Sequence, residues 1–596
     1  MSTAIVSGQP VPGSSLENDL RSLGFDVRVA ADEAEAETLL AAAPAGDRVA
    51  LVDARFVGHR HALRLGLTDP RFPLCAVPGA VTAQPAARQA LTRAVARETS
   101  AGGGTALAVD SLADRIVTAL GSDGCEVHRP ELGSLVAAVP ADPQARNEAR
   151  QSVAAVDDEA VRLKSAVKSR DGFFTTFFIS PYSRYIARWC ARRGLTPNQV
   201  TTASLLTALI AAGCAATGTR GGFVAAGVLL IASFVLDCTD GQLARYALKY
   251  STLGAWLDAT FDRAKEYAYY AGLALGAARG GHDDVWALAL GAMVLQTCRH
   301  VVDFSFNEAN HDATANTSPT AALSDKLDSV GWTVWVRRMI VLPIGERWAL
   351  IAVLTAATTP RITFYVLLAG CAFAATYTTA GRVLRSVTRK ATRTDRAAQA
   401  LADLADNGPL ASLVARATRA RLGTPPVVAL AGTAVLAVSL FSGVTWAPVA
   451  GAVVYASTAG QALRGPLKGP LDWLVPPLFR AAEYGTVLVL ASKAGVNGAL
   501  PAAFGLVAAV AYHHYDTVYR IRGNAGAPPA WLVRSIGGHE GRTLLVTVLA
   551  AALTASQFTV ALTVLAVAVA LVVLVESIRF WVSAGAPAVH DEGEPA

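Results

Sequence analysis

Long apolar runs dominate the chain from about residue 200 onward. A helix needs about 20 apolar residues to cross the ~30 Å hydrocarbon layer of a bilayer, and each of the first runs is close to that length. These runs predict membrane-spanning helices near 200–219, 221–238, 255–278, 284–303, 340–358 and 363–381. The third of them begins with charged residues. Residues 160–381 are therefore predicted to form a six-helix membrane domain.

A second group of apolar runs fills residues 427–584. Its uncharged stretches at 427–463 and 543–575 are each long enough for two membrane passes, which gives about twelve spans in two blocks of six for the whole chain. Residues 382–426, between the blocks, are rich in basic residues and alanine, so we expect a linker there. Residues 585–596 form a tail.

The first 150 residues follow a different pattern, in which short strand-like and helix-like stretches alternate. In chain order these are Phe25–Ala30 (strand), Ala31–Ala43 (helix), Val49–Asp53 (strand), Ala86–Glu98 (helix) and Thr105–Val109 (strand). Strands separated by helices are typical of a parallel α/β sheet. The fold class predicted is thus a mainly α-helical polytopic membrane protein with an N-terminal α/β domain at 1–150. Glycines 102–104 lack the spacing of a phosphate-binding loop, so we expect a turn there.

Composition supports a membrane protein with a soluble domain. Hydrophobic residues make up 53% of the chain and charged residues 16%, against about 25% charged in soluble proteins. The seven cysteines are scattered and form no Cys-x-x-Cys pair, which argues against a zinc site or a disulfide framework. No basic segment followed by an apolar run begins the chain, so we expect no signal peptide and a cytosolic N-terminal domain.

Basic residues cluster beside the predicted spans. In Pro181–Arg193, arginines recur every four residues while Ile186 and Trp189 lie toward another face, as in a helix that lies in the membrane interface. A second basic cluster occupies residues 382–396. Excess Lys and Arg in short loops mark the cytoplasmic side. Because both clusters adjoin membrane spans, they do not predict a nucleic-acid site.

A constellation of carboxylates, small residues and one arginine crosses the ends of the second and third spans. It reads Asp237-x2-Asp240-Gly241-x2-Ala244-Arg245-x8-Gly254-x3-Asp258-x3-Asp262. Carboxylates in membrane helices are costly to bury and tend to be functional. Spacings of three and four residues place each aspartate pair on one face of its helix, so adjacent helices would bring four carboxylates together.

Such a set of oxygen ligands predicts a site for hard divalent cations. Four carboxylates cannot all stay ionised side by side without a counter-charge. With no Cys or His in the motif, Mg²⁺ or Mn²⁺ is favoured over Zn²⁺, and two such ions can clamp the oxygens of an in-line phosphoryl displacement. The alternative is an ion or proton pathway in a transporter, but a proton relay needs no fixed Gly, Ala and Arg spacing.

The motif resembles the signature of the CDP-alcohol phosphotransferase (CDP-alcohol phosphatidyltransferase) family, with all eight fixed positions present. Thr196-Pro197-Asn198, just before the first span, resembles an entry motif of that family, and the resemblance covers residues 160–381. It implies a fold of six transmembrane helices. It also implies an enzyme that cleaves a CDP-linked alcohol, releases CMP and passes the phospho-alcohol group to a hydroxyl.

The resemblance assigns a role to each residue of the motif. Asp237, Asp240 and Asp258 would ligate the metal ions, of which two are expected. Asp262 would ligate as well or act as general base on the acceptor hydroxyl, so that Asp258 and Asp262 are the expected catalytic residues. The residues expected to hold or make room for the CDP portion are Gly241, Ala244, Arg245, Gly254 and Asn198.

Two further segments bear on the substrate. Lys164–Gly172 and Leu342–Arg347 resemble the family branch in which a cytosolic nucleotidyltransferase is fused to an inositol-phosphate phosphotransferase that uses a CDP-inositol donor. The N-terminal domain lacks the glycine-rich nucleotide loop of that branch, so an inactive, degenerate copy is expected. A CDP-diacylglycerol donor is the alternative within this class. A transporter or a non-catalytic membrane scaffold is the alternative outside it.

Several residues near span ends have two readings. Arg299, Arg337 and Arg338 would either bind an acceptor phosphate by bidentate contacts or anchor the positive side of the membrane domain. His300 and Asp303 lie at the same boundary, where a packing or capping pair is favoured over a catalytic one.

The second membrane block resembles a degenerate copy of the first. The matches keep their order along the chain, and they pair Asp237 and Asp240 with Ala456 and Ala459, Arg263–Tyr267 with Arg480–Tyr484, and His300–Asp303 with His513–Asp516. Because the first two aspartates are lost, we predict a structural or regulatory partner rather than a second active site. Family members commonly form homodimers, and here the fused repeat would instead make one chain an intramolecular pseudo-dimer.

Overall fold

The chain divides into two compact units. The computed structural model describes residues 2–100, 111–168, 171–281, 283–317, 331–388, 390–418 and 422–583. The first unit comprises Met1–Ser169 together with Tyr182–Pro197 and Thr239–Tyr250, and the second contains the rest of the chain. Helix α10 (Arg220–Ala247) is continuous and contributes residues to both units.

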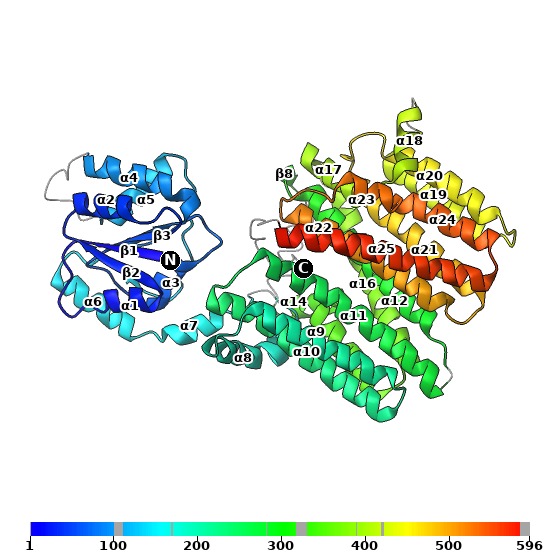
Figure 1. Cartoon of the computed structure of the whole chain (residues 1–596), viewed down its shortest axis with the longest axis horizontal. Coiled ribbons are helices and arrows are strands. Elements are labelled where there is room, and N and C mark those ends of the chain that lie inside the picture. Colours follow the sequence, from blue (N-terminus) through cyan, green and yellow to red (C-terminus); the bar gives the residue numbers. More distant parts are fainter. Residues whose placement is uncertain are drawn as a thin grey trace. The chain divides into compact units, whose positions relative to one another are not determined.

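The first unit contains a five-stranded sheet with the strand order β2-β1-β3-β6-β5, flanked by helices (Figure 1). The sheet strands are β1 (Ser2–Ser7), β2 (Phe25–Ala30), β3 (Arg48–Asp53), β5 (Leu74–Val77) and β6 (Ala80–Ala83). The helices are α1 (Leu16–Ser22), α2 (Glu33–Ala42), α3 (Arg60–Thr68), α4 (Arg88–Ser100), α5 (Leu112–Ser122), α6 (Pro143–Ala154) and α7 (Asp158–Ser165). A two-stranded pair joins β4 (Val57–Gly58) to β7 (Ala137–Ala138).

Both faces of this sheet are covered, because side chains along a strand alternate between faces. From β1, Ile5 packs into the core beneath α2, α4 and α5, whereas Ala4 and Val6 pack into the opposite core with α1 and α3. The four central residues of β1 are all buried, as expected of a strand covered on both sides. The expected strand 105–109 and the glycines at 102–104 lie outside the described residues.

The sheet is mixed, which corrects the expectation of a parallel sheet. Strands β1, β2 and β3 are parallel, but β6 runs antiparallel to both β3 and β5. The reason is local: β5 and β6 are joined by the two residues Pro78 and Gly79, and Gly79 has a φ of 76°. So short a connection can only make a hairpin, since a parallel crossover needs a dozen residues or more.

The helices of the first membrane block follow the predicted spans closely. A π-helical turn at Thr175–Ile179 leads into α8 (Ser180–Arg192), whose Tyr182, Tyr185 and Trp189 are exposed. The block continues with α9 (Pro197–Ala216), α10, α11 (Thr252–Gly281), α12 (Trp286–Asn310), α14 (Gly331–Val341), α15 (Ile344–Ala357) and α16 (Pro360–Thr388).

The second block repeats this order of helices. It consists of α19 (Pro425–Leu440), α20 (Ala447–Ala462), α21 (Val475–Ala494), α22 (Ala499–Arg522), α23 (Ala530–Ser535), α24 (Gly538–Ala552) and α25 (Ala555–Ser583). A short helix precedes a longer one in both blocks, as α14 before α15 and as α23 before α24.

The segment between the blocks is more ordered than the linker expected at 382–426. Helix α16 extends to Thr388, a short pair joins β8 (Thr314–Thr317) to β9 (Lys390–Thr392), and two helices follow, α17 (Asp395–Leu404) and α18 (Pro409–Ala417). Leu401 and Leu404 of α17 are buried, and this helix packs against α12, α21 and α22. The alanine-rich composition of this segment reflects an amphipathic helix.

The chain contains an integral membrane part. Among the described residues, five helices are long and apolar enough to cross a membrane, and the number rises to six if Val334–Val341 and Ile344–Ala357, bent by 64°, form one broken span. The expected count of twelve is not confirmed, because α19, α20 and α24 are shorter than a full span and other helices carry charged residues.

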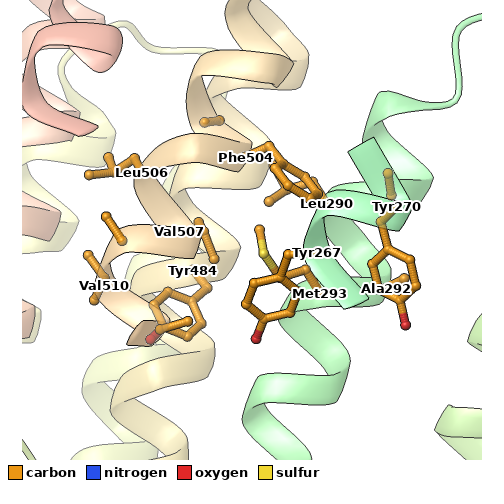
Figure 2. Packing of buried hydrophobic residues seen from close by; sticks show 14 of the residues in the cluster. Tyr267, Tyr270, Leu290, Ala292, Met293, Tyr484, Phe504, Leu506, Val507 and Val510 are labelled. Atoms are coloured by element: carbon orange, nitrogen blue, oxygen red, sulfur yellow. The ribbon is translucent and has the colours of Figure 1, made fainter. Parts of the chain in front are cut away.

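The two blocks pack against each other through a shared apolar core (Figure 2). Helix α11 contacts α22, helix α12 contacts α21, and α12 also contacts α22. Figure 2 shows Tyr267 and Met293 from the first block facing Tyr484, Phe504 and Val507 from the second. Since α11 and α12 correspond in order to α21 and α22, each helix meets the counterpart of its own neighbour, as in a two-fold interface.

Candidate functional site

The predicted aspartates lie where α10 and α11 approach the turn that joins them. Asp237 and Asp240 belong to the C-terminal half of α10, and Asp258 and Asp262 to the first turns of α11. The intervening turn is short, and Leu248 within it has a φ of 49°. Consecutive helices joined so tightly lie side by side, which is how two distant pairs of residues in the motif come to face each other.

Three of the four aspartates form one cluster. Asp237, Asp240 and Asp258 each place a carboxylate oxygen within 4.8 Å of the other two, and Asp240 is buried. Opposite ligand oxygens of an octahedral Mg²⁺ lie about 4 Å apart, because each is 2.0–2.1 Å from the ion. The spacing and the all-oxygen donor set therefore fit a hard divalent cation.

Lys265 ties the fourth aspartate to this cluster. Its ammonium group is fully buried, donates to Asp237 Oδ1, and lies 2.9 Å from Asp262 Oδ1. It also donates to Ser204 Oγ at 3.2 Å and lies over the ring of Trp348. Lys265 thus compensates part of the negative charge of these carboxylates, and a divalent cation would neutralise more of it.

The last turns of α10 carry the residues expected to hold the nucleotide. Arg245 Nε donates to the carbonyl oxygen of Ala166 at 2.6 Å, which fixes the guanidinium beside the end of α7. A Cβ atom at Gly241 would lie 3.5 Å from that guanidinium, an ordinary contact. Because Gly241 has no side chain and Ala244 only a methyl group, no bulky side chain projects from the helix surface next to Arg245. Such a surface lets a large group approach both the backbone and the arginine.

Gly254 and Asn198 lie close together although 56 positions separate them in the sequence. A Cβ atom at Gly254 would stand 2.7 Å from Asn198 Oδ1 and 2.8 Å from Ser251 Oγ. Real Cβ atoms do not approach polar atoms so closely, so this position accepts only glycine while Asn198 keeps its orientation. Their role here is to fit the start of α9 against the start of α11.

The residues considered for an acceptor phosphate are held by main-chain and ring contacts. Buried Arg299 donates to the carbonyl oxygens of Val341 and Leu342, and Arg338 donates to that of Asp171 at 3.0 Å. His300 lies 2.9 Å from the Gln296 side chain. Asp303 accepts from Arg382 of α16, as a structural pair would. Arg337 also interacts with other residues of the chain.

Both blocks contain a buried triad in which one glutamate pairs with two arginines. In the first, Glu266 accepts from Arg347 at 2.9 and 3.0 Å and from Arg263 at 3.2 Å. In the second, Glu483 accepts from Arg480 at 2.9 Å and from Arg542 at 2.5 Å. The paired residues occupy matching positions of the repeated sequence pattern. Charge pairs buried this deeply are costly to form unless their geometry is good, so the recurrence of the triad indicates a common architecture.

The acidic residues of the second block serve structural contacts. Glu540 accepts from the backbone of Gly408 and Ala411 at the start of α18, and Asp516 accepts from Ser577 and Trp581 of α25. Asp472 accepts from the backbone nitrogen of Gly469. Within the part of the chain that the structure describes, the only group of three or more potential metal ligands is the one at Asp237, Asp240 and Asp258.

Sequence reasoning missed Lys265 and its partner Ser204. The available signal was an ionisable residue within a membrane helix, three positions after Asp262 and on the same face. Ser204 gave no signal, because a serine in an alanine-rich helix is commonplace and its partner lies 61 positions away.

Comparison with known proteins assigns the two blocks differently. Residues 194–375 match the family model described as CDP-alcohol phosphatidyltransferase, and residues 395–596 match a family of unknown function (DUF5941). The chain is 36% identical over 131 residues to the phosphatidylinositol phosphate synthase of Streptomyces avermitilis. It is 36% identical over 91 residues to the archaetidylinositol phosphate synthase of Pyrococcus horikoshii. It is 32% identical over 114 residues to the bifunctional IPC transferase and DIPP synthase of Aquifex aeolicus.

These matches cover only parts of each protein. They span 21%, 15% and 19% of this chain, and 51%, 47% and 26% of the Streptomyces, Pyrococcus and Aquifex relatives. The region that matches the family model contains the carboxylate cluster, since it begins before α9 and ends within α16. Residues 194–375 are therefore similar to the CDP-alcohol phosphatidyltransferase family, and the chain spans about half the length or less of the curated relatives it matches.

Proposed function

We propose that the chain is a transferase that moves a phospho-alcohol group from a CDP-alcohol to a hydroxyl acceptor and releases CMP. The observation that carries this proposal is the cluster of Asp237, Asp240 and Asp258, assembled from two helices within the matched family region. A purely structural role would not require three carboxylates to converge on one point, because their mutual repulsion destabilises the fold without a cation.

The metal-binding residues in this proposal are Asp237, Asp240 and Asp258, with Asp262 beside them. When bound there, two Mg²⁺ or Mn²⁺ ions supply positive charge that stabilises the pyrophosphate oxygens of the donor. Lys265 holds Asp237 and Asp262 in fixed orientations, so the ligands are arranged before any cation arrives. Such preorganisation lowers the cost of assembling the site.

The remaining residues bind the donor and move one proton. Arg245 contacts the donor phosphates, and the helix surface at Gly241 and Ala244 accommodates the cytidine portion. Asp262 accepts the proton of the acceptor hydroxyl while that oxygen attacks phosphorus. A new phosphorus–oxygen bond forms to the acceptor, the bond to the CMP oxygen breaks, and CMP leaves with the electron pair.

The product is proposed to be an inositol-phosphate type of lipid or its soluble counterpart. Two of the relatives are named as inositol phosphate lipid synthases, and a third as an IPC transferase and DIPP synthase. Lys164–Gly172 and Leu342–Arg347 carry the same resemblance in this chain. The donor is then either CDP-diacylglycerol or CDP-inositol, and Arg299, Arg337 and Arg338 are the candidates to contact an acceptor phosphate.

The second block is proposed to be a duplicated partner that has lost its own site. Support comes from the shared helix order, from the repeated Arg–Glu–Arg triad, and from the exchange of contacts between α11 and α12 and their counterparts. One chain is then an intramolecular pseudo-dimer with twelve membrane helices. The α/β domain and the carboxylate cluster face the cytoplasm, since basic residues flank both ends of the first block.

The test is CMP release by the purified protein in detergent with Mg²⁺ or Mn²⁺. CDP-diacylglycerol and CDP-inositol are compared as donors, each with inositol phosphate and with other alcohols as acceptors. CMP release is expected with one of the two donors, and a chelator should abolish it. Asp258→Asn and Asp262→Asn should each reduce CMP release by about a hundredfold or more, the scale of removing one group that acts in the transition state.

Asp283→Asn is a matched control, because this aspartate pairs with Arg361 at the far end of α11 and should leave turnover unchanged. Absence of CMP release with every donor, from protein that is folded and binds Mn²⁺, would refute the transferase. Ion-coupled uptake into proteoliposomes without CMP release would instead support the transporter alternative.

A further inference from the structure

The N-terminal α/β unit has a cavity at a position where open α/β sheets bind ligands. Its strand order places β2 on one side of β1 and β3 on the other, so the connections leaving β1 and β3 diverge at their carboxyl ends. A crevice outside the carboxyl ends of such strands is the usual ligand position in this architecture. No residue of the motif that defines the membrane site lines this cavity.

The cavity itself has about 130 Å³ of free volume. Its wall combines the loop after β1, the segment after β3 and one face of α6, contributed chiefly by Gly13, Ser14, Ser15, Phe56, Arg146 and Arg150. One water needs only about 10–15 Å³ of such space, so the cavity has room for several waters or for a phosphate group.

The wall carries two arginines, Arg146 and Arg150, against one carboxylate, Asp19, so its net charge favours an anion. Arg146 donates to the carbonyl oxygen of Arg55 at 3.2 Å, and Arg150 to that of Gly13 at 3.3 Å. Within the described part of the chain neither guanidinium has a carboxylate partner. Burial and the neighbouring charge of Arg150 together lower the pKa of Arg146, as expected for like charges held close without a counter-ion.

The loop after β1 is built to expose polar groups toward this space. Gly8 and Gly13 have φ values of 100° and 72°, conformations that glycine adopts without strain. They turn the chain so that Ser14 and Ser15 line the cavity opposite α6. Ser15 also donates to Asp19, another wall residue, which holds the loop in place. Two arginines and the Ser14 hydroxyl around this space form a complementary set of donors for a phosphate group.

We propose that this cavity binds the phosphate group of a small phosphorylated molecule, with Arg146 and Arg150 as its charged contacts and Ser14 as its hydroxyl donor. The site is separate from the carboxylate cluster and does not depend on the function proposed for it. The chemistry identifies a phosphate group. The rest of the ligand, whether absent, a polyol or a nucleoside, is distinguished by the probes of the experiment.

The experiment is hydrogen–deuterium exchange of the full-length protein in detergent, read by mass spectrometry. Inorganic phosphate, glycerol phosphate and CTP are added separately at millimolar concentration, with sodium chloride of equal ionic strength as the blank. We expect slower exchange in the peptides that cover Gly8–Asp19 and Pro143–Ala154, saturating with at least one probe. The probe that acts at the lowest concentration identifies the source of the phosphate.

Variants locate the effect. Arg150→Ala, at an exposed position, and Arg146→Ala/Arg150→Ala should raise the half-saturating concentration by about tenfold or more, because charge-assisted hydrogen bonds are lost. Arg93→Ala, an exposed arginine of α4, is the matched control and should change nothing. Asp258→Asn should also leave these two peptides unaffected, which separates this site from the membrane site.

Two results would overturn the proposal. One is unchanged exchange in both peptides with all three probes. The other is protection that persists in the double variant, provided that exchange in β1 and β3 without ligand matches the wild type and so establishes that the variant is folded.

Discussion

Lys265 offers the sharpest test of how the carboxylate cluster is held together. Its ammonium is fully buried between Asp237 and Asp262, whose side chains are 11% and 16% exposed. Replacement by methionine keeps most of the volume and removes the charge. Two nearly buried carboxylates then lose their counter-charge, and breaking a buried ion pair costs about 3–5 kcal/mol. For a domain of this size that corresponds to a melting temperature lower by roughly 6–20 °C.

A divalent cation should reverse much of this loss. Binding to the folded state alone contributes about 2.7 kcal/mol at a concentration one hundred times the dissociation constant. The variant should gain more than the wild type, because its cluster has lost a counter-charge and therefore binds the cation more tightly. Lys265→Met is therefore expected to melt well below the wild type in a chelator and much closer to it in Mg²⁺ or Mn²⁺. Thermal unfolding of the purified protein in detergent, followed by tryptophan fluorescence, measures both differences.

Lys493→Met is the matched control for this experiment. Lys493 also lies in a membrane helix, but it donates to the carbonyl oxygen of Leu440 and contacts Phe441. Its replacement should show no dependence on divalent cations. Equal melting of Lys265→Met and wild type in the chelator would refute the reasoning, as would a deficit that Mg²⁺ leaves unchanged.

Three other outcomes are expected. Gly254→Ala should destabilise the protein by about 1–3 kcal/mol through overpacking against Asn198, and adding Asn198→Ala should restore part of the loss in a double-mutant cycle of thermal melts. Arg542→Ala should cost about 3–5 kcal/mol by breaking the triad of the second block, whereas Arg579→Ala should have little effect in the same melts. Burial and nearby arginines lower the pKa of His61 to about 3 from 6.5, so the α/β unit binds fewer protons folded than unfolded and loses stability as the pH falls below 6.5. At pH 5 the loss is about 2 kcal/mol, and His61→Leu should remove it in pH-dependent unfolding.

The membrane helices and the main site were predictable because they depend on local pattern. Apolar runs placed the starts of α9, α10 and α16 within about three residues, whereas α10 and α16 continue beyond the predicted ends at 238 and 381 to Ala247 and Thr388. Spacings of three and four residues correctly implied that Asp237 and Asp240 share a face, and Asp258 joins them in the structure. Each inference needed only helix periodicity and the cost of charge in a membrane.

What escaped prediction depends on distant partners. The antiparallel β6 follows from a two-residue connection that was not recognised as a hairpin, because its strands are only four residues long. The close fit of Gly254 against Asn198 joins residues from different helices. Helix α17 was not predicted because it lies in a segment rich in basic residues. Its apolar face becomes buried only when α12 and α22 pack against it.

The covalent connection from α16 through α17 has a consequence for how the two blocks stay together. Two separate copies in a membrane associate according to their density, and a poorly expressed protein would spend part of its time apart. Blocks on one chain meet at an effective concentration in the millimolar range, whatever the number of molecules in the bilayer. The packing of α11 and α12 against α21 and α22 is therefore insensitive to dilution. Each half is also free to acquire substitutions that a symmetric pair would have to accept twice.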